Sequence, residues 1–268
     1  MDATAATWFP YLRRIWDLRY FWFSLVHNDL HTRYRRSFLG IGWSMARPIG
    51  MTIVFCVIFP SLLNVDRGEY APFVLVGLTC WQFLTETILA GCQTFRTGAA
   101  YIRQQRVPLA IFPLRTTLGA AFHMGLALML GLAVTWFLKG PIFLPVLWTI
   151  VPSLILMFIL GWALATVAGL ANTHFPDTCH LLELVLQFLF YLTPIIFRPG
   201  HVGLHGRASW IVDLNPLWSV LELVRQPVLY GQLPPAYNVG VALAFVAAMV
   251  ALAVICLKKL ERTLVFWV

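Results

Sequence analysis

Polar side chains recur at helical spacing inside two strongly apolar stretches of the chain. In the first stretch, intervals of 3, 4, 7 and 3 residues separate Thr79, Gln82, Glu86, Gln93 and Arg96. This spacing places all five on one face of one helix. Because a glutamate is costly in hydrocarbon, we expect Glu86 to face the interior of a helix bundle or a cavity that holds water.

A second polar face lies further along the chain, where Glu183, Gln187, Tyr191 and Pro194 are 4, 4 and 3 residues apart. Two such faces are compatible with a water-filled pathway through a membrane, and equally with hydrogen bonds that join neighbouring helices. The pathway interpretation assigns as lining residues Thr79, Trp81, Gln82, Glu86, Glu183, Gln187 and Tyr191. In that interpretation, Trp81 and Tyr191 offer ring faces on which a passing sugar can stack.

The composition requires a membrane around these faces. Of the 268 residues, 60% are apolar and 11% are charged, whereas soluble domains have roughly 45–50% and about 25%. These values exclude a soluble domain, a disordered chain, a coiled coil and a disulfide scaffold. The net charge of +8 would suggest nucleic acid in a soluble protein. Here the charges lie between apolar runs and set topology, so we expect no nucleic-acid partner.

Six stretches are long and apolar enough to cross a bilayer, which takes about 20 residues. We therefore predict an all-α integral membrane protein with six transmembrane helices, at about residues 43–63, 71–97, 114–138, 145–171, 181–197 and 237–257. The fifth is the shortest. In the fourth, small residues spaced four apart from Ser153 to Gly169 favour close helix packing. His123, alone in the third, is expected to be hydrogen-bonded within the bundle rather than to carry protons.

Basic residues predict the orientation. With both termini in the cytoplasm, fourteen Lys and Arg side chains lie inside and five outside, which is the asymmetry that the positive-inside rule requires. Residues 1–40 lack the apolar core of a cleavable signal peptide. We therefore expect a multi-pass protein of the cytoplasmic (inner) membrane whose first apolar run acts as the insertion signal.

Three further segments are predicted not to span. Residues 1–42 place apolar side chains at near-helical spacing from Leu12 to Leu30, which is typical of an amphipathic helix in the membrane interface. The alternative is a simple basic anchor. The connection from Arg96 to Arg115 mixes cations with apolar side chains, which favours docking to a partner protein over anchoring to the membrane surface.

The third segment, residues 198–236, is too apolar for open solvent and too short to cross twice. Pro216 can start a helix and Pro227 would end one. We predict one or two short re-entrant outer helices between the fifth and sixth spans. Non-helical backbone at that depth must be buried in protein or line a cavity.

Sequence motifs for chemistry are absent. There is no GxxxxGK[ST] phosphate loop, no HExxH and no GxSxG. The five cysteines have no metal-binding spacing, and we expect no disulfide. We therefore expect neither a catalytic site nor a metal or cofactor site in this chain.

Specific motifs add to this interpretation. His27 to Trp43 reads HNDLHTRYRRSFLGIGW and is followed by Arg47-Pro48. Further on come YLTPII at 191–196, LNPL at 214–217 with Glu222 and Arg225, and a basic tail from Lys258. In this order they resemble the permeases of type-2 ABC exporters for polysaccharides along the whole chain. The first motif is the most specific, although its Ile41-Gly42 stands where leucine is more usual.

The resemblance implies a single type-2 ABC transmembrane domain over residues 1–268, a homodimer, and two copies of a separate ATPase that would hold ATP and magnesium. It implies a lipid-linked polysaccharide substrate, O-antigen in the first place, with capsule and teichoic acid as relatives. Membrane lipids are further expected partners. By the family pattern the ATPase would contact Arg33, Arg35, Arg36, Arg96, Tyr101, Arg103, Arg106, Phe112 and Arg115. The outer gate would comprise Asn215, Pro216, Trp218, Glu222 and Arg225.

Other functions stay open at this point. A type-2 ABC exporter of drugs or small lipids is one, although such exporters often carry large outer domains that are absent here. An integral-membrane enzyme acting on lipid-linked sugars would require an acid or base cluster at one membrane face, and the sequence shows none. A structural scaffold would leave the two polar faces without a purpose.

Overall fold

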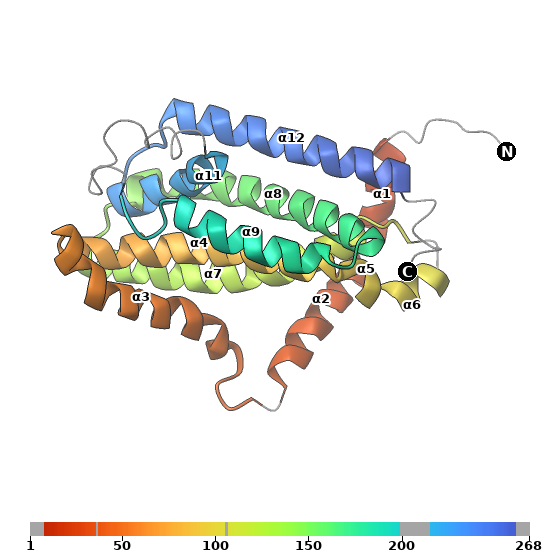
Figure 1. Ribbon diagram of the computed structural model, residues 1–268, viewed down its shortest axis with the longest axis horizontal. Coiled ribbons are helices and arrows are strands. Elements are labelled where there is room, and N and C mark those ends of the chain that lie inside the picture. The colour runs from red at the N-terminus through yellow and green to blue at the C-terminus, as the bar shows by residue number, and fades with distance from the viewer. Residues whose placement is uncertain (1–7, 36, 105–106, 199–214, 261–268) are drawn as a thin grey trace.

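The computed structural model describes residues 8–35, 37–104, 107–198 and 215–260, and all regular structure within them is helical. Five of the predicted spans are found as long apolar helices in this part of the chain. Four of them, with α9, run side by side in a bundle, while α3 diverges from it (Figure 1). The five long helices are α3 (Trp43–Leu63), α4 (Arg67–Cys92), α7 (Ile111–Lys139), α8 (Leu147–His174) and α12 (Ala236–Leu260).

The fifth predicted span differs from its expectation of 181–197. It is the 15-residue helix α9 (Thr178–Leu192), about 22 Å long at 1.5 Å per residue, against about 30 Å of hydrocarbon. The helix ends because the residue before a proline is forced out of the helical region. Thr193, which precedes Pro194, is accordingly extended, with φ −91° and ψ 133°.

Helix α4 forms the centre of the bundle and contacts α3, α7, α8, α9 and α11. Its first turn is capped by Asp66, whose carboxylate accepts a hydrogen bond from the Glu69 backbone N–H at 3.2 Å. It ends at Cys92 rather than at residue 97, and the separate turn α5 (Thr94–Thr97) follows. The predicted close packing of α8 is confirmed, because a Cβ at Gly169 would lie 2.7 Å from the backbone oxygen of Gly91 in α4.

One end of the bundle, here called the connection end, carries α5 and the short helix α6 (Ala99–Gln104). Helix α1 (Trp8–Asp17) and the end of α12 lie there too (Figure 1). A small apolar cluster joins these elements, in which Tyr11, Phe95, Phe112 and Leu257 pack together. Helix α1 is therefore fixed to the segment that leads into α7.

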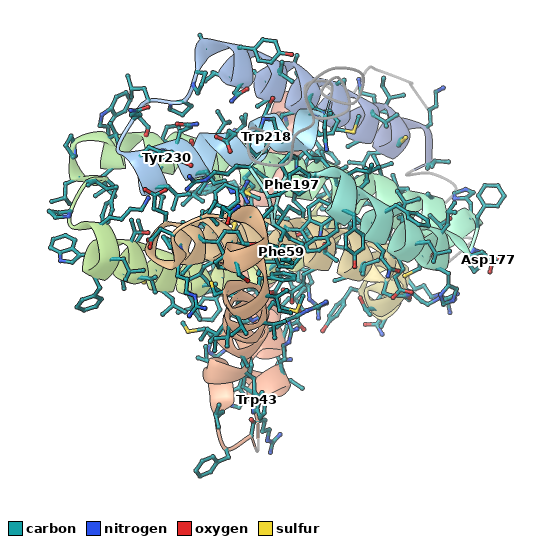
Figure 2. All side chains as sticks on the ribbon, turned by 60° about the vertical axis from the view of Figure 1, so that its left-hand side comes forward. Trp43, Phe59, Asp177, Phe197, Trp218 and Tyr230 are labelled. Carbon is teal, nitrogen blue, oxygen red and sulfur yellow. The ribbon has the colours of Figure 1, made fainter. Side chains whose placement is uncertain are left out.

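Helix α2 (Arg19–Tyr34) runs from the connection end away from the bundle at an angle. Helix α3 runs back toward the bundle, so α2 and α3 form a V (Figure 1). The 3-10 turn η1 (Gly40–Gly42) leads into α3. Trp43 lies near the tip of the V, far from the bundle (Figure 2), and its side chain is exposed. Only Leu25 and Val26 of α2 are buried.

The opposite end of the bundle, here called the α11 end, carries the described part of the segment that the sequence predicts to be re-entrant. Helix α11 (Pro216–Arg225) begins at the proline, as predicted, and continues into the π-helical turn η4 (Gln226–Tyr230). Pro227 therefore lies inside a wider turn and does not end the helical segment. The chain turns at Gly231, whose φ of 61° suits glycine. Between α7 and α8 lies the 3-10 turn η2 (Leu144–Val146).

Candidate functional site: a polar groove between α3, α4 and α9

A groove of about 650 Å³ opens along the bundle between α3, α4 and α9, and the last turn of α2 reaches into it. Its polar lining is drawn from all four helices and consists of Arg33, Arg47, Gln82, Thr85, Glu86, Glu183 and Gln187. Because α3, α4 and α9 are largely apolar, this lining forms a polar strip at the depth of the bundle. Such a strip can hydrate the groove and offer hydrogen bonds to hydroxyl-rich molecules.

The structure brings six of the seven predicted pathway residues to this groove, namely Trp81, Gln82, Glu86, Glu183, Gln187 and Tyr191. Their participation in transport stays a prediction. Thr79 is turned away from the groove. Its side chain is buried and donates a 2.8 Å hydrogen bond to the backbone oxygen of Leu75, one turn earlier in the same helix.

The two predicted stacking residues differ in access. Trp81 is only 7% exposed and lies against Phe190, with ring centroids 5.9 Å apart. Tyr191 is 64% exposed and meets Phe190 edge to face at 5.3 Å. The ring of Tyr191 is therefore open to a molecule in the groove, while the ring of Trp81 is covered by protein.

Glu86 is paired, and its partner comes from outside the bundle. Its Oε1 accepts a hydrogen bond from Arg33 Nη1 at 2.5 Å. His123 Nδ1 lies 3.3 Å from the same oxygen, and His123 Nε2 lies 2.8 Å from the hydroxyl of Tyr34. His123 is thus a hydrogen-bonded bundle residue, as predicted. Burial alone would lower the pKa of Arg33, but the hydrogen bond and charge of Glu86 raise it overall, so the guanidinium stays charged.

The resemblance implied that Arg33 contacts an ATPase, and its position in the groove was not predicted. Arg33 and Glu86 are 53 residues apart, and no local pattern links them. The only available signal was the cost of an unpaired glutamate among apolar residues, which requires some partner without naming it. Arg35 is exposed, and Arg36 lies outside the described residues.

The connection between α4 and α7 presents some of its predicted contact residues and buries others. Arg96 and Arg103 are exposed, and Tyr101 is 36% exposed with its ring 5.5 Å from that of Phe21 in α2. Phe112, in contrast, is fully buried. Its ring packs beneath Gly98, where a Cβ would come within 2.5 Å of it. Phe112 therefore shapes the connection from inside and offers no surface to a partner.

Arg115 is engaged within the chain, because its guanidinium makes a two-pronged ion pair with Asp29 of α2. Arg106 lies outside the described residues. Two of the predicted contact residues, Phe112 and Arg115, thus hold the connection to its neighbours. Among the predicted contact residues of this segment that the structure describes, Arg96, Tyr101 and Arg103 are the exposed ones.

At the α11 end, the predicted gate residues tie helix α11 to the bundle. Asn215 caps α11 by accepting from the Leu217 N–H at 3.0 Å and donates to Thr193 Oγ1 at 2.9 Å. Arg225 is fully buried and donates to the carbonyl oxygens of Pro194 at 2.6 Å and Ile195 at 2.8 Å.

The Arg225 guanidinium lies 4.0 Å from the ring centroid of Phe73 and against Gly77, both in α4. Glu222 is 3.9 Å away, one turn earlier in α11. The ring of Trp218 lies 5.7 Å from the same guanidinium, and Pro216 occupies the first turn of α11. Gly77 is a residue that sequence reasoning missed, and nothing in its neighbourhood marked it as the position against which an arginine packs.

Within the described residues, no group of three or more His, Cys, Asp or Glu side chains is arranged to hold a metal ion. One pair of charged groups in the groove, Arg33 and Glu86, instead joins two helices, and Glu183 lies 3.8 Å from His180 of its own helix. The polar side chains of the groove can hydrate a passage and make shallow polar contacts. The pair between α2 and α4 also links the position of one helix to that of the other.

The comparisons with known proteins agree with one another. A model of a family described as "ABC-2 type transporter" matches residues 20–229, from α2 to η4. Two proteins of Klebsiella pneumoniae, each named "O-antigen export system permease protein RfbA", are 25% and 26% identical to this chain. The alignments cover 86% and 80% of this chain and 88% and 82% of the relatives. A protein of the same name from Myxococcus xanthus is 25% identical, over 84% of this chain and 86% of its own.

Proposed function

The chain belongs to the ABC-2 type transporter family, and on that premise we propose that it is the membrane-spanning permease of an ATP-driven exporter of a lipid-linked polysaccharide. O-antigen is the polysaccharide class that we propose, because three relatives that are named O-antigen export permeases align over four fifths or more of the chain. The observation that carries the proposal is the groove between α3, α4 and α9, which provides a polar surface at the depth of the bundle.

The chemistry of the groove suits a sliding polymer. Gln82 and Gln187 offer amide donors and acceptors, and Tyr191 offers an open ring. Conduction requires contacts that are favourable enough for entry and weak enough for release. A wall of single polar contacts meets both requirements, because no one position holds the polymer.

ATP hydrolysis belongs, in this proposal, to a separate ATPase chain that also holds the magnesium. Two ATPase copies pair with two copies of this permease, and the surface of Arg96, Tyr101 and Arg103 is where each docks. The permease homodimer is proposed because the groove is open along one side, where Gln187 and Tyr191 are exposed. A second copy facing that side would close the passage.

We further propose six crossings of the cytoplasmic (inner) membrane with both termini in the cytoplasm. Helix α9 is the fifth crossing in this arrangement, and it is short because the turn at Pro194 and the re-entrant α11 occupy the remaining depth. The connection end then faces the cytoplasm and the α11 end faces outward. This orientation places the exposed cations Arg96 and Arg103 on the side that the positive-inside rule favours.

Cysteine replacement within α9 tests the proposal. In a chain whose five native cysteines are replaced by alanine, we would compare Gln187→Cys with Val185→Cys. Positions 185 and 187 are about 200° apart on a helix, both are exposed, and only Gln187 lines the groove. Surface polysaccharide would be measured in a host lacking the native permease gene, before and after treatment with a bulky thiol reagent.

The expected result is export that is blocked by the reagent in Gln187→Cys and unaffected in Val185→Cys. Equal insensitivity of the two variants would contradict the groove as the pathway. A deletion host that still displays its polysaccharide, but loses export of a small lipid or drug, would contradict the proposed substrate class and favour the alternative exporter.

A further inference from the structure

The last turn of α2 is joined to the bundle by two adjacent polar contacts. Arg33 donates to Glu86 of α4, and the hydroxyl of Tyr34 lies 2.8 Å from His123 Nε2 of α7. The two contacts are linked, because His123 Nδ1 also lies 3.3 Å from Glu86 Oε1 and 3.4 Å from Arg33 Nη1. Four side chains from three helices thus form one cluster, here called the α2 cluster, at the wall of the groove.

The other parts of α2 touch the connection between α4 and α7. The ring of Phe21 packs against Tyr101 of α6, and Asp29 pairs with Arg115 at the start of α7. Helix α1 adds to this contact, because the Tyr11 hydroxyl accepts from the Ala110 N–H at 3.3 Å. A continuous series of contacts therefore runs from the connection, through α2, to a glutamate in the groove wall.

Helix α2 itself is only lightly held by apolar packing. Two of its residues are buried, and the Arg33 side chain is 57% exposed while that of Glu86 is 20% exposed. The glutamate thus belongs to the groove wall, whereas its partner arrives on a helix that lies along the outside of the bundle. A helix with so few buried contacts can shift as a body at lower cost than a helix of the core.

Displacing α2 changes the electrostatics of the groove. With Arg33 in place, the carboxylate of Glu86 is neutralised. If α2 moves away, the carboxylate loses the Arg33 guanidinium and keeps only its contact with His123 of α7. Among apolar helices this state is tolerable only when water enters to solvate the carboxylate. The position of α2 and the hydration of the groove are therefore linked, and such a shared two-state element is what coupling between distant sites requires.

We infer that Arg33, Tyr34, Glu86 and His123 form a latch that couples movement of the connection to wetting of the groove. The four are positioning residues for transport rather than polysaccharide contacts. In the resting state the latch is closed and the groove wall is neutral. Movement of the connection draws α2 away, the Arg33–Glu86 pair opens, and the groove becomes hydrated. This inference rests on the proposed export function.

Charge variants of the latch, assembled with the ATPase partner, provide the test. Arg33→Gln, Glu86→Gln, the double variant, and the exchanged pair Arg33→Glu with Glu86→Arg would be compared. Glu69→Gln is the matched control, since it removes an ion pair with Arg198 at the α11 end, with an N–O distance of 3.2 Å. Export and ATP hydrolysis would both be measured per assembled complex, so that a variant that merely folds poorly is recognised by its low yield.

We expect each single variant to raise the ratio of ATP hydrolysed to polysaccharide exported by about tenfold, within the usual range of coupling between sites. The double variant should be no worse than either single one, the exchanged pair should restore part of the coupling, and Glu69→Gln should behave as the wild type. This pattern requires Arg33 and Glu86 to act as a unit. A purely structural role would lower the yield of complex and would leave the ratio of ATP hydrolysed to polysaccharide exported unchanged.

Two results would overturn the latch. If the single effects multiply in the double variant, the two residues act independently. If only Glu86→Gln changes export, the carboxylate contacts the substrate directly and Arg33 is irrelevant. A wild-type complex that exports no polysaccharide would instead refute the proposed function, and this outcome is separate because it does not depend on any latch variant.

Discussion

Replacing Gly77 by alanine is expected to destabilise the protein, although alanine is the better helix former. Gly77 lies in the middle of α4, and a Cβ at this position would overlap the guanidinium of Arg225. The guanidinium cannot simply swing away, because the side chain is fully buried and its two terminal nitrogens donate to the carbonyl oxygens of Pro194 and Ile195. Relieving the overlap therefore breaks contacts between α11 and the turn that follows α9.

The size of the effect follows from these contacts. A hydrogen bond from a charged donor contributes about 1.5–3 kcal/mol, so losing both costs roughly 3–6 kcal/mol. Alanine in place of glycine gains about 1 kcal/mol of helix propensity. The net loss in the free energy of unfolding is then about 2–5 kcal/mol. At roughly 2–4 °C per kcal/mol for a chain of this size, the melting temperature should fall by about 4–20 °C.

A thiol-reactive fluorogenic dye measures this unfolding on purified protein in detergent, because Cys80 and Cys92 are buried and react only when the bundle opens. Gly125→Ala is the matched control. Gly125 also lies inside a long helix, α7, but nothing would come within 4 Å of its Cβ. This variant should melt at or slightly above the temperature of the wild type.

A double-variant comparison separates the proposed cause from others. In an Arg225→Ala background the overlap no longer exists, so adding Gly77→Ala should change the melting temperature little. The reasoning would be refuted if Gly77→Ala had the same melting temperature as Gly125→Ala. It would also be refuted if Gly77→Ala lowered the melting temperature as much in the Arg225→Ala background as in the wild type.

The other predictions concern topology, docking and packing. With single cysteines in a cysteine-free chain, an impermeant maleimide added to intact cells should label position 232 (Gln232 in the native chain) and not position 100 (Ala100), and the reverse pattern would invert the proposed orientation. Arg96→Glu with Arg103→Glu should weaken recruitment of the ATPase roughly 2- to 30-fold, as expected for two exposed charges, in a pull-down that leaves membrane insertion unchanged; normal recruitment would remove this surface from the interface. Phe112→Ala should lower the free energy of unfolding by about 3–5 kcal/mol through a cavity beneath Gly98, and an unchanged melting curve would contradict its structural role.

Much of the architecture follows from local pattern. Five of the six predicted spans are long apolar helices, and the span predicted over 43–63 has these bounds in the structure. The polar faces were predicted in part, because side chains three or four residues apart on a helix share a face. Gln82 and Glu86 of α4 line the groove together with the polar face of α9. Thr79 is buried instead, and Gln93 and Arg96 lie beyond the end of α4, so the five predicted residues do not share one helix. Helix ends were less certain. The fifth span ends at Leu192 and not at the predicted residue 197, because Pro194 forces Thr193 out of the helical region.

The sequence by itself therefore determined that this chain is a membrane bundle, which helices form it, and which faces of those helices are polar. Only the tertiary structure decided what those faces meet. That Glu86 pairs with Arg33 depends on the angle at which α2 leaves the bundle, and that Arg225 is buried depends on the space that Gly77 leaves in α4. The physical reason is that periodicity is a property of one helix, whereas the partner of a buried charge is set by how separate helices cross.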